Sequence, residues 1–184
     1  MKELSLHILD IVQNSTKARA TEIRIEVLED IPANLFRITI RDNGCGIGEK
    51  ELRTITNPFT TSRTTRRVGL GLALLQAAAE QCRGALTIES QEGQGTTVSA
   101  TFEHDHIDRQ PLGDIVSTLI SLMIGHPEID FVYRHQVNDR IFRLHTQDIR
   151  QELGDVPLSD APVVHFLTEY IQENIDSLYE EANL

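Results

Sequence analysis

The sequence predicts an α+β fold in which a mixed β-sheet is covered on one face by helices. Four segments are strand-like, and the first two alternate polar and apolar side chains with a period of two. Two segments are helical: residues 3–19 carry apolar side chains partly at helical spacing, and residues 68–82 are rich in Ala and Leu. The strand-like segments are 21–27, 35–40, 84–90 and 96–102.

The connecting segments complete this order. Residues 28–34 contain a proline and are expected to form a loop between the first two strands. Residues 49–55 are expected to form a short charged helix, and residues 57–67, rich in Thr and Arg without apolar periodicity, a loop. Residues 3–103 therefore have the predicted order α-β-β-α-loop-α-β-β.

Composition excludes several classes of protein. The chain has 184 residues and a net charge of −11, so binding to nucleic acid is not expected. No apolar run is long enough to span a membrane, and the N-terminus does not resemble a signal peptide. Two cysteines form no metal-binding pattern. These features favour a cytoplasmic protein with no membrane segment.

The stretch from Asp42 to Gly46 places an acid, an amide and two glycines directly after a strand. Asn43-Gly44 is a strong signal for a hairpin turn, which explains part of the pattern. A second interpretation is that a flat ligand lies against this backbone and that Asp42 recognises one edge of it. The residues alone leave both interpretations open.

Asp10 and Asn14 are spaced i and i+4, so on a helix their side chains lie on the same side, one turn apart. They could be solvated or could cap the helix end. They could also bind a divalent metal and its water, because Mg²⁺ prefers oxygen ligands and keeps several waters.

The run Gly69-Leu70-Gly71-Leu72 opens the second long helix. Glycines at a helix N-terminus let an anion approach the free backbone N–H groups, although close helix packing explains many such runs. The preceding loop contains Arg63, Arg66 and Arg67, whose guanidinium groups match phosphate oxygens; the alternative is an ordinary exposed charged loop. Thr96, at the start of the last strand of this region, could offer a hydroxyl group to a ligand.

Taken in order, the segments "LDIVQNSTKA", "DNGCGI", "PFTTSRTTRRVGLGLALL" and "GQGTTVSATF" resemble the motifs of the GHKL ATP-binding family. That family includes gyrase, the ninety-kilodalton heat-shock chaperone, histidine kinases and the mismatch-repair ATPases. The resemblance covers residues 3–103. The segment "PFTTSRTTRRVGLGL" is most similar to the histidine-kinase form, whereas "NSTKARATEIRIEV" is also similar to the mismatch-repair ATPases. The resemblance implies the Bergerat fold, a sandwich of a mixed sheet and one layer of helices, with ATP and Mg²⁺ as ligands.

The resemblance also implies roles for individual residues. On the adenine side, Asp42 would accept a hydrogen bond from the adenine amino group, Gly44 and Gly46 would let the nucleotide lie close, and Thr96 would lie nearby. On the phosphate side, Asn14 would ligate Mg²⁺ and Lys17 would reach a phosphate. The phosphate-binding run would be Gly69, Leu70, Gly71 and Leu72.

The chain departs from the family pattern at two places. Arg67-Val68 replaces the Gly-Thr pair that commonly precedes Gly-Leu-Gly-Leu in histidine kinases. Position 10 carries Asp, where histidine kinases usually carry Asn and the ATPases carry Glu as a general base. Asp10 is therefore the candidate catalytic residue, either as a base or only as a contact to metal-bound water.

Residues 104–184 lie outside the resemblance and are expected to form a small α-β-β-α-α unit that packs on the ATP-binding domain or on a partner. A helix at 111–125, strands at 129–135 and 139–146, a short helix at 146–153 and a terminal helix from Ser159 or Asp160 are predicted. His104 and His106 are expected in a surface linker. The histidines at 126, 135, 145 and 165 show no metal-ligand spacing.

These observations predict two domains, residues 1–103 for ATP binding and residues 104–184 for partner contact or packing. The expected function is a stand-alone regulatory protein that binds Mg-ATP and acts as a protein kinase or a slow ATPase. A non-catalytic module that senses nucleotide and a fragment of a histidine autokinase are the alternatives. The sequence identifies no protein partner, and a homodimer is compatible with it.

Overall fold

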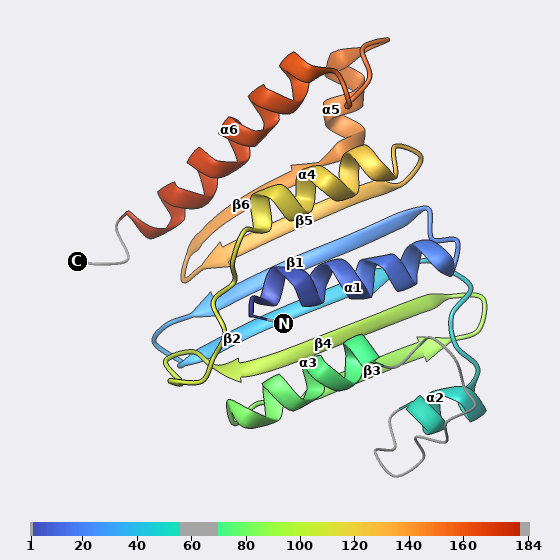
Figure 1. Cartoon of the computed structure of the whole chain (residues 1–184), viewed down its shortest axis with the longest axis vertical. Coiled ribbons are helices and arrows are strands. Elements are labelled where there is room, and N and C mark those ends of the chain that lie inside the picture. Colours follow the sequence, from blue (N-terminus) through green and yellow to red (C-terminus); the bar gives the residue numbers. More distant parts are fainter. Residues whose placement is uncertain (1, 56–69, 181–184) are drawn as a thin grey trace.

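A computed structural model describes residues 2–55 and 70–180. Figure 1 shows the elements in chain order. The helices are α1 (Leu4–Lys17), α2 (Glu49–Ile55), α3 (Leu70–Gln81), α4 (Ile115–Gly125), α5 (Thr146–Leu153) and α6 (Ala161–Tyr179). The strands are β1 (Glu22–Asp30), β2 (Leu35–Asp42), β3 (Leu86–Gln91), β4 (Gly95–Glu103), β5 (Asp130–Val137) and β6 (Arg140–His145).

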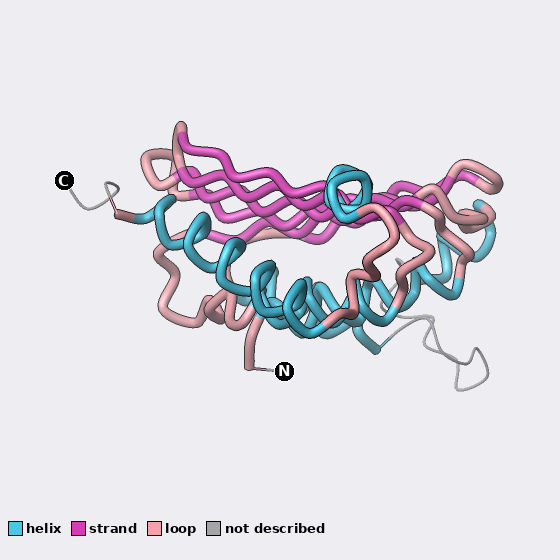
Figure 2. The backbone as a smooth tube through the Cα atoms, turned by 90° about the horizontal axis from the view of Figure 1, so that it is seen from above, coloured by secondary structure: helices cyan, strands magenta, loops and turns pink. Residues whose placement is uncertain are grey.

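The described strands form one mixed sheet in the order β3-β4-β2-β1-β5-β6. Neighbouring strands are antiparallel except for β1 and β5, which are parallel. Helices α1, α3, α4 and α6 lie side by side on one face of the sheet (Figure 2). The predicted α+β fold, a mixed sheet with a single layer of helices, is confirmed.

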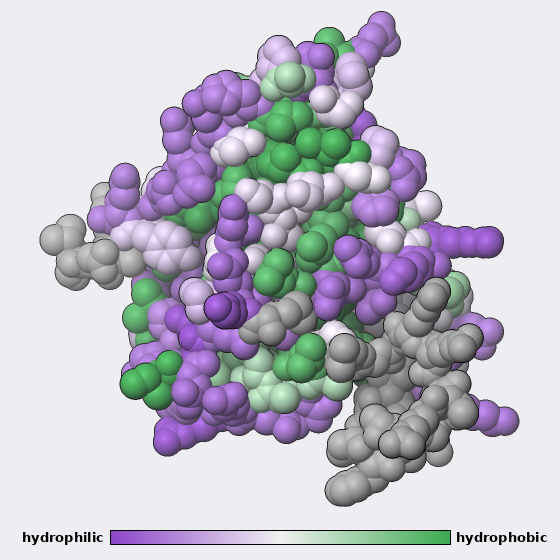
Figure 3. All heavy atoms as spheres, in the orientation of Figure 1, coloured by the Kyte–Doolittle hydropathy of each residue, from purple (hydrophilic) through white to green (hydrophobic). Residues whose placement is uncertain are grey.

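Alternation along the strands explains why the helices gather on one face. Every second residue of β1 and β2 is buried, and all of these except Glu29 and Asp42 are apolar and share one core cluster with residues of α1 and α3. The buried apolar residues of these strands are Ile23, Ile25, Val27, Phe36, Ile38 and Ile40. Seen from the helix side, apolar atoms also reach the surface between α4 and α6 (Figure 3). Within the described ranges, every helix is too short or too polar to cross a bilayer.

One predicted boundary was wrong. Residues 28–34 were expected to form a loop, but β1 continues through Asp30. Leu28, Glu29 and Asp30 are paired with β2, so the turn itself is short, and Asn34 adopts a positive φ of 53° in it. The proline therefore lies in the turn and not in the paired strand, where it would remove a hydrogen-bond donor.

The C-terminal residues extend the same sheet. β5 pairs in parallel with β1, so β5 and β6, from residues 104–184, belong to the same sheet as the strands of residues 1–103. The core also continues, because Ile171 and Ile175 of α6 belong to the same cluster of buried residues as Ile8 of α1. The aromatic residues Phe131, Tyr133 and Phe142 of β5 and β6 are buried in this core.

A buried polar cluster holds the end of α6 against the sheet. The Glu29 carboxylate accepts hydrogen bonds from His104 Nε2 (2.8 Å), His135 Nε2 (3.2 Å) and the Tyr179 hydroxyl. His135 is completely buried, and its Nδ1 lies 3.0 Å from the Tyr133 hydroxyl. Burial raises the pKa of Glu29, but the bonds from His135, Tyr179 and His104 outweigh burial and hold it at about 2. His104 was expected in a surface linker, but the structure places its side chain in this polar cluster.

Candidate functional site

Asp42 is the centre of a hydrogen-bonded network at the end of β2. Its side chain faces the helix layer and is 8% exposed. Oδ2 accepts a hydrogen bond from Ser15 Oγ at 2.6 Å. Oδ1 accepts one from the backbone N–H of Gly44 (2.9 Å) and one from that of Thr96 (3.3 Å). Three donors from three segments therefore fix this carboxylate in one orientation.

Ser15 was missed in the sequence analysis, which considered only its neighbour Asn14. The side chain of Ser15 is buried on the same face of α1 as Ile8, Ile11 and Val12. A serine within an otherwise apolar helical face needs a hydrogen-bond partner. That isolated hydroxyl was the only sequence signal that could have identified it, and it did not indicate which residue it would contact.

The two glycines of the loop are required by the packing of the backbone. A methyl group added at Gly44 would lie 2.8 Å from the Ala18 carbonyl oxygen, and the N–H of Cys45 donates to that same oxygen. Gly46 has a φ of +68°, and a methyl group there would lie 2.0 Å from the Gln91 carbonyl oxygen. Both close contacts are with protein backbone, so the glycines have a structural reason that is independent of any ligand.

Thr96 lies beside Asp42 at the start of β4, and its Cα is paired with that of Asp42 across the ladder. Its hydroxyl lies 2.8 Å from Ser90 Oγ, which also accepts a hydrogen bond from the N–H of Ile47 at 2.8 Å. The loop after β2 is thereby connected to both β3 and β4. Thr96 was expected near Asp42, and the structure brings the two residues together.

Asp10 lies against Gly71 where α1 packs against α3, and Asn14 follows Asp10 by one turn of α1. A methyl group added at Gly71 would lie 3.1 Å from Asp10 Oδ2, so α3 approaches this carboxylate closely. Asp10 and Asn14 are both partly exposed, one turn apart on α1. Within the described part of the chain, neither side chain has a hydrogen bond or an ion pair. Their oxygens are thus available to a ligand.

The remaining predicted residues lie in different environments. Lys17 is the exposed last residue of α1. The side chain of Leu72 is buried in the core. Leu70 begins α3. Five residues named in the sequence analysis lie outside the described ranges: Arg63, Arg66, Arg67, Val68 and Gly69.

The family follows from comparison with known proteins. Residues 2–106, more than half of the chain, match the model of the family described as histidine kinase-, DNA gyrase B- and HSP90-like ATPase. The chain therefore belongs to this ATPase family, as the four motifs predicted. The matched residues are an ATPase domain of this family that is similar to the ATPase domains of histidine kinases.

Curated relatives include longer bacterial signalling proteins. The non-motile and phage-resistance protein of Caulobacter vibrioides is 32% identical over 123 residues, which cover 64% of this chain and 15% of that protein. The sensor histidine kinase ZraS of Escherichia coli is 28% identical over 106 residues, covering 58% of this chain and 23% of ZraS. The chain thus spans a quarter or less of these two relatives.

A solved structure shows the same fold. The N-terminal domain of a DNA repair protein superposes with a TM-score of 0.53 at 18% identity. The match covers 78% of this chain and 52% of that chain. It therefore extends well beyond residues 2–106 and includes part of the C-terminal region.

Proposed function

We propose that this chain binds Mg-ATP between α1, α3 and the loop after β2, and that it transfers the γ-phosphate either to a separate protein or, slowly, to water. The observation that carries the proposal is the fixed carboxylate of Asp42. A carboxylate offers about four acceptor sites, so the three donors to Asp42 leave one that can accept a hydrogen bond from an adenine amino group. Thr96 and the close-packed Gly44–Gly46 backbone would form the wall beside the base.

The other end of the nucleotide would lie along α1. Asn14 would hold Mg²⁺ through its amide oxygen, which fits because this side chain has no partner among the described residues. The metal would neutralise charge on the β- and γ-phosphates. Lys17 would lie at the phosphate end, and the backbone N–H groups at the start of α3, including that of Gly71, would face the anion.

Asp10 would hold the proton of the attacking group. Its carboxylate lies beside Gly71, next to the helix start that would bind phosphate. A general base must be within hydrogen-bond reach of its proton, directly or through one water. Asp has a shorter side chain than the Glu of the related ATPases, so we expect slow hydrolysis.

Two measurements test the proposal. Titration with ATP, with and without Mg²⁺, should show binding that Mg²⁺ strengthens. Incubation with γ-labelled ATP and a cell extract should then label a protein if the chain is a kinase, or release only phosphate if it is an ATPase. Absence of ATP binding by the folded chain would refute the proposal.

Two further candidates remain. The similarity to histidine kinases, which exceed this chain in length, favours a role as the ATP-binding part of a histidine autokinase. A module that senses nucleotide without catalysis is the other. ATP binding without transfer or phosphate release would support the sensing module, and transfer to a histidine of a linked or added helical domain would support the autokinase.

A further inference from the structure

The outward face of α6 carries acids and no lysine or arginine. The chain has neither of these cations after Arg150, so every charged side chain of α6 other than His165 is acidic. α6 lies over β6, the edge strand of the sheet, and its apolar side chains are buried against the core (Figure 1). The acids of α6 and its C-cap, all exposed, are Glu169, Glu173, Asp176 and Glu180.

The spacing of these acids opposes helix formation. Glu169 and Glu173 are four residues apart, as are Asp176 and Glu180, and like charges at that spacing destabilise a helix. Glu169 lies 3.4 Å from His165, whereas Glu173 has no hydrogen bond or ion pair with any described residue. The helix therefore keeps an acidic row that its own side chains do not neutralise.

Two aromatic side chains lie among these acids. Phe166 is 63% exposed, and Tyr170, one turn later, is 40% exposed. Their rings are stacked, with centroids 6.0 Å apart and an interplanar angle of 16°. The ring of Tyr170 also meets the buried ring of Phe142 edge-on at 6.0 Å, which anchors the pair to the core. Glu169 and Glu173 follow Phe166 by three and seven residues, so helical spacing places them on the same side of α6 as the exposed rings.

The cations of β6 and α5 leave this face acidic. Arg140 donates to the carbonyl oxygen of Ser177 at 2.6 Å, near the end of α6 that is distant from Phe166. Arg150 of α5 is paired with Asp130. Arg143 alternates with buried residues of β6, so its side chain points to the opposite face of the sheet.

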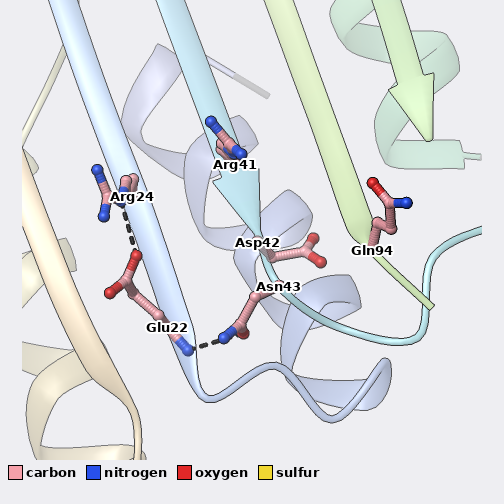
Figure 4. A pocket seen from close by; sticks show the side chains of 6 residues that line it. All are labelled: Glu22, Arg24, Arg41, Asp42, Asn43 and Gln94. Carbon is pink, nitrogen blue, oxygen red and sulfur yellow. Dashed lines mark hydrogen bonds and ion pairs between the residues drawn. The ribbon is translucent and has the colours of Figure 1, made fainter. Parts of the chain in front are cut away.

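The charge pattern of α6 differs from that of the open face of the sheet, where cations and acids are mixed. Arg24 Nε donates to Glu22 at 2.7 Å, and Arg41 lies directly opposite Arg24 on the neighbouring strand (Figure 4). Glu26, two residues after Arg24, adds a further acid to that face. A surface of mixed charge favours no one class of charged partner, whereas the single sign of α6 favours a cationic one.

We propose that the face of α6 around Phe166, Tyr170, Glu169 and Glu173 is a docking surface for a short arginine-rich segment of a partner protein. One guanidinium group of the segment lies over the exposed ring of Phe166, because the face of an aromatic ring attracts a cation. Neighbouring guanidinium groups donate to the carboxylates of Glu169 and Glu173.

Charge complementarity selects this partner. An acidic segment, a nucleic acid or a second copy of this chain, with its net charge of −11, is repelled by the acidic row. The proposal does not depend on ATP binding, since α6 lies outside residues 2–106, which match the ATPase family.

Fluorescence anisotropy at low salt with a labelled twelve-residue peptide of alternating Arg and Ser tests the proposal. Peptides with Lys or with Gln in place of Arg are the control probes. The variant Phe166→Leu removes the ring and keeps an apolar side chain. A double variant carries Glu169→Gln and Glu173→Gln. Its matched control carries Glu89→Gln and Glu92→Gln, which remove the same charge from exposed residues of β3 and the turn after it, at the opposite edge of the sheet.

The Arg peptide should bind the parent chain more tightly than the Lys peptide does, and the Gln peptide should not bind. Affinity for the Arg peptide should fall about 10-fold in the Glu169 and Glu173 double variant and less than twofold in its matched control, since two exposed ion pairs supply this much binding energy. Phe166→Leu should lower affinity about threefold and remove the preference for Arg over Lys, because the cation then has no ring to contact.

Circular dichroism verifies that each variant is folded, and single variants, with a loss of about threefold each at Glu169 and Glu173, replace a double variant that is not. Absence of Arg-peptide binding to the parent would overturn the proposal, and so would equal losses in the two double variants or unchanged affinity in Phe166→Leu. Self-association of the parent in analytical ultracentrifugation that Phe166→Leu abolishes, without peptide binding, would assign this face to a second copy instead.

Discussion

Replacing Asp42 with Asn changes one carboxylate oxygen to an NH₂ group and keeps the shape of the side chain. The amide oxygen can take the place of Oδ1 and still accept from the N–H groups of Gly44 and Thr96. The NH₂ group then faces Ser15 Oγ, which can accept from it and turn its own proton toward the Ile11 carbonyl oxygen, 3.4 Å away. The fold should therefore tolerate the change, at a cost of about 1 kcal/mol.

The same Asp42→Asn change should greatly weaken ATP binding. The atom nearest the ligand becomes a donor facing the adenine amino group, which is also a donor. Loss of a charge-assisted hydrogen bond at a buried group costs roughly 2–5 kcal/mol, or about 30-fold to several thousand-fold in affinity. Calorimetric titration with Mg-ATP measures this loss. Asp30→Asn, the same change at the far end of β1, is the matched control and should leave affinity unchanged. Affinity within twofold of the parent in a folded Asp42→Asn chain would refute the adenine assignment.

Four further outcomes are expected. Asn14→Ala should leave metal-free ATP binding unchanged and remove most of the gain from Mg²⁺, which parallel titrations would show; intact Mg²⁺ dependence would make Asn14 structural. Asp10→Asn should keep Mg-ATP affinity and lower phosphate release about 10²–10⁴-fold, and hydrolysis at the parent rate would exclude it as a base. The free energy of unfolding should fall by about 3 kcal/mol as pH drops from about 4.5 to about 2. Folding lowers the pKa of Glu29, so the ionised Glu29 carboxylate stabilises the fold fully above this pH range and no longer below it. Urea unfolding of Glu29→Gln should lack this fall. Gly46→Ala should destabilise by about 2 kcal/mol or more, whereas Gly93→Ala, with a φ of +77° but open space around it, should cost only about 1 kcal/mol in the same unfolding experiment.

Much of the fold could be predicted because the local signals agree with the tertiary structure. The alternation in β1 and β2 matches a sheet with one buried face, and the predicted helices at 3–19 and 68–82 correspond to α1 and α3. The sequence did not reveal that β5 pairs with β1. A strand pairing of that kind joins residues about a hundred positions apart, and neither segment carries a local signal for its partner.

The candidate site was predicted at its charged and glycine positions and missed at its supporting ones. Asp42 and Gly46 are unusual residues for a strand end, so they are visible in the sequence. Ser15 is unremarkable locally, and its importance lies in a contact 27 residues away. The cluster of Glu29, His104 and His135 was missed for the same reason, since it joins three segments that are distant in the chain.

A crystal structure of the chain with Mg²⁺ and a non-hydrolysable ATP analogue tests the central claim most directly. The account predicts that the adenine amino group lies within hydrogen-bond distance of an Asp42 carboxylate oxygen and that Mg²⁺ is bound by the amide oxygen of Asn14. A nucleotide bound elsewhere, or bound here with its adenine away from Asp42, would contradict it.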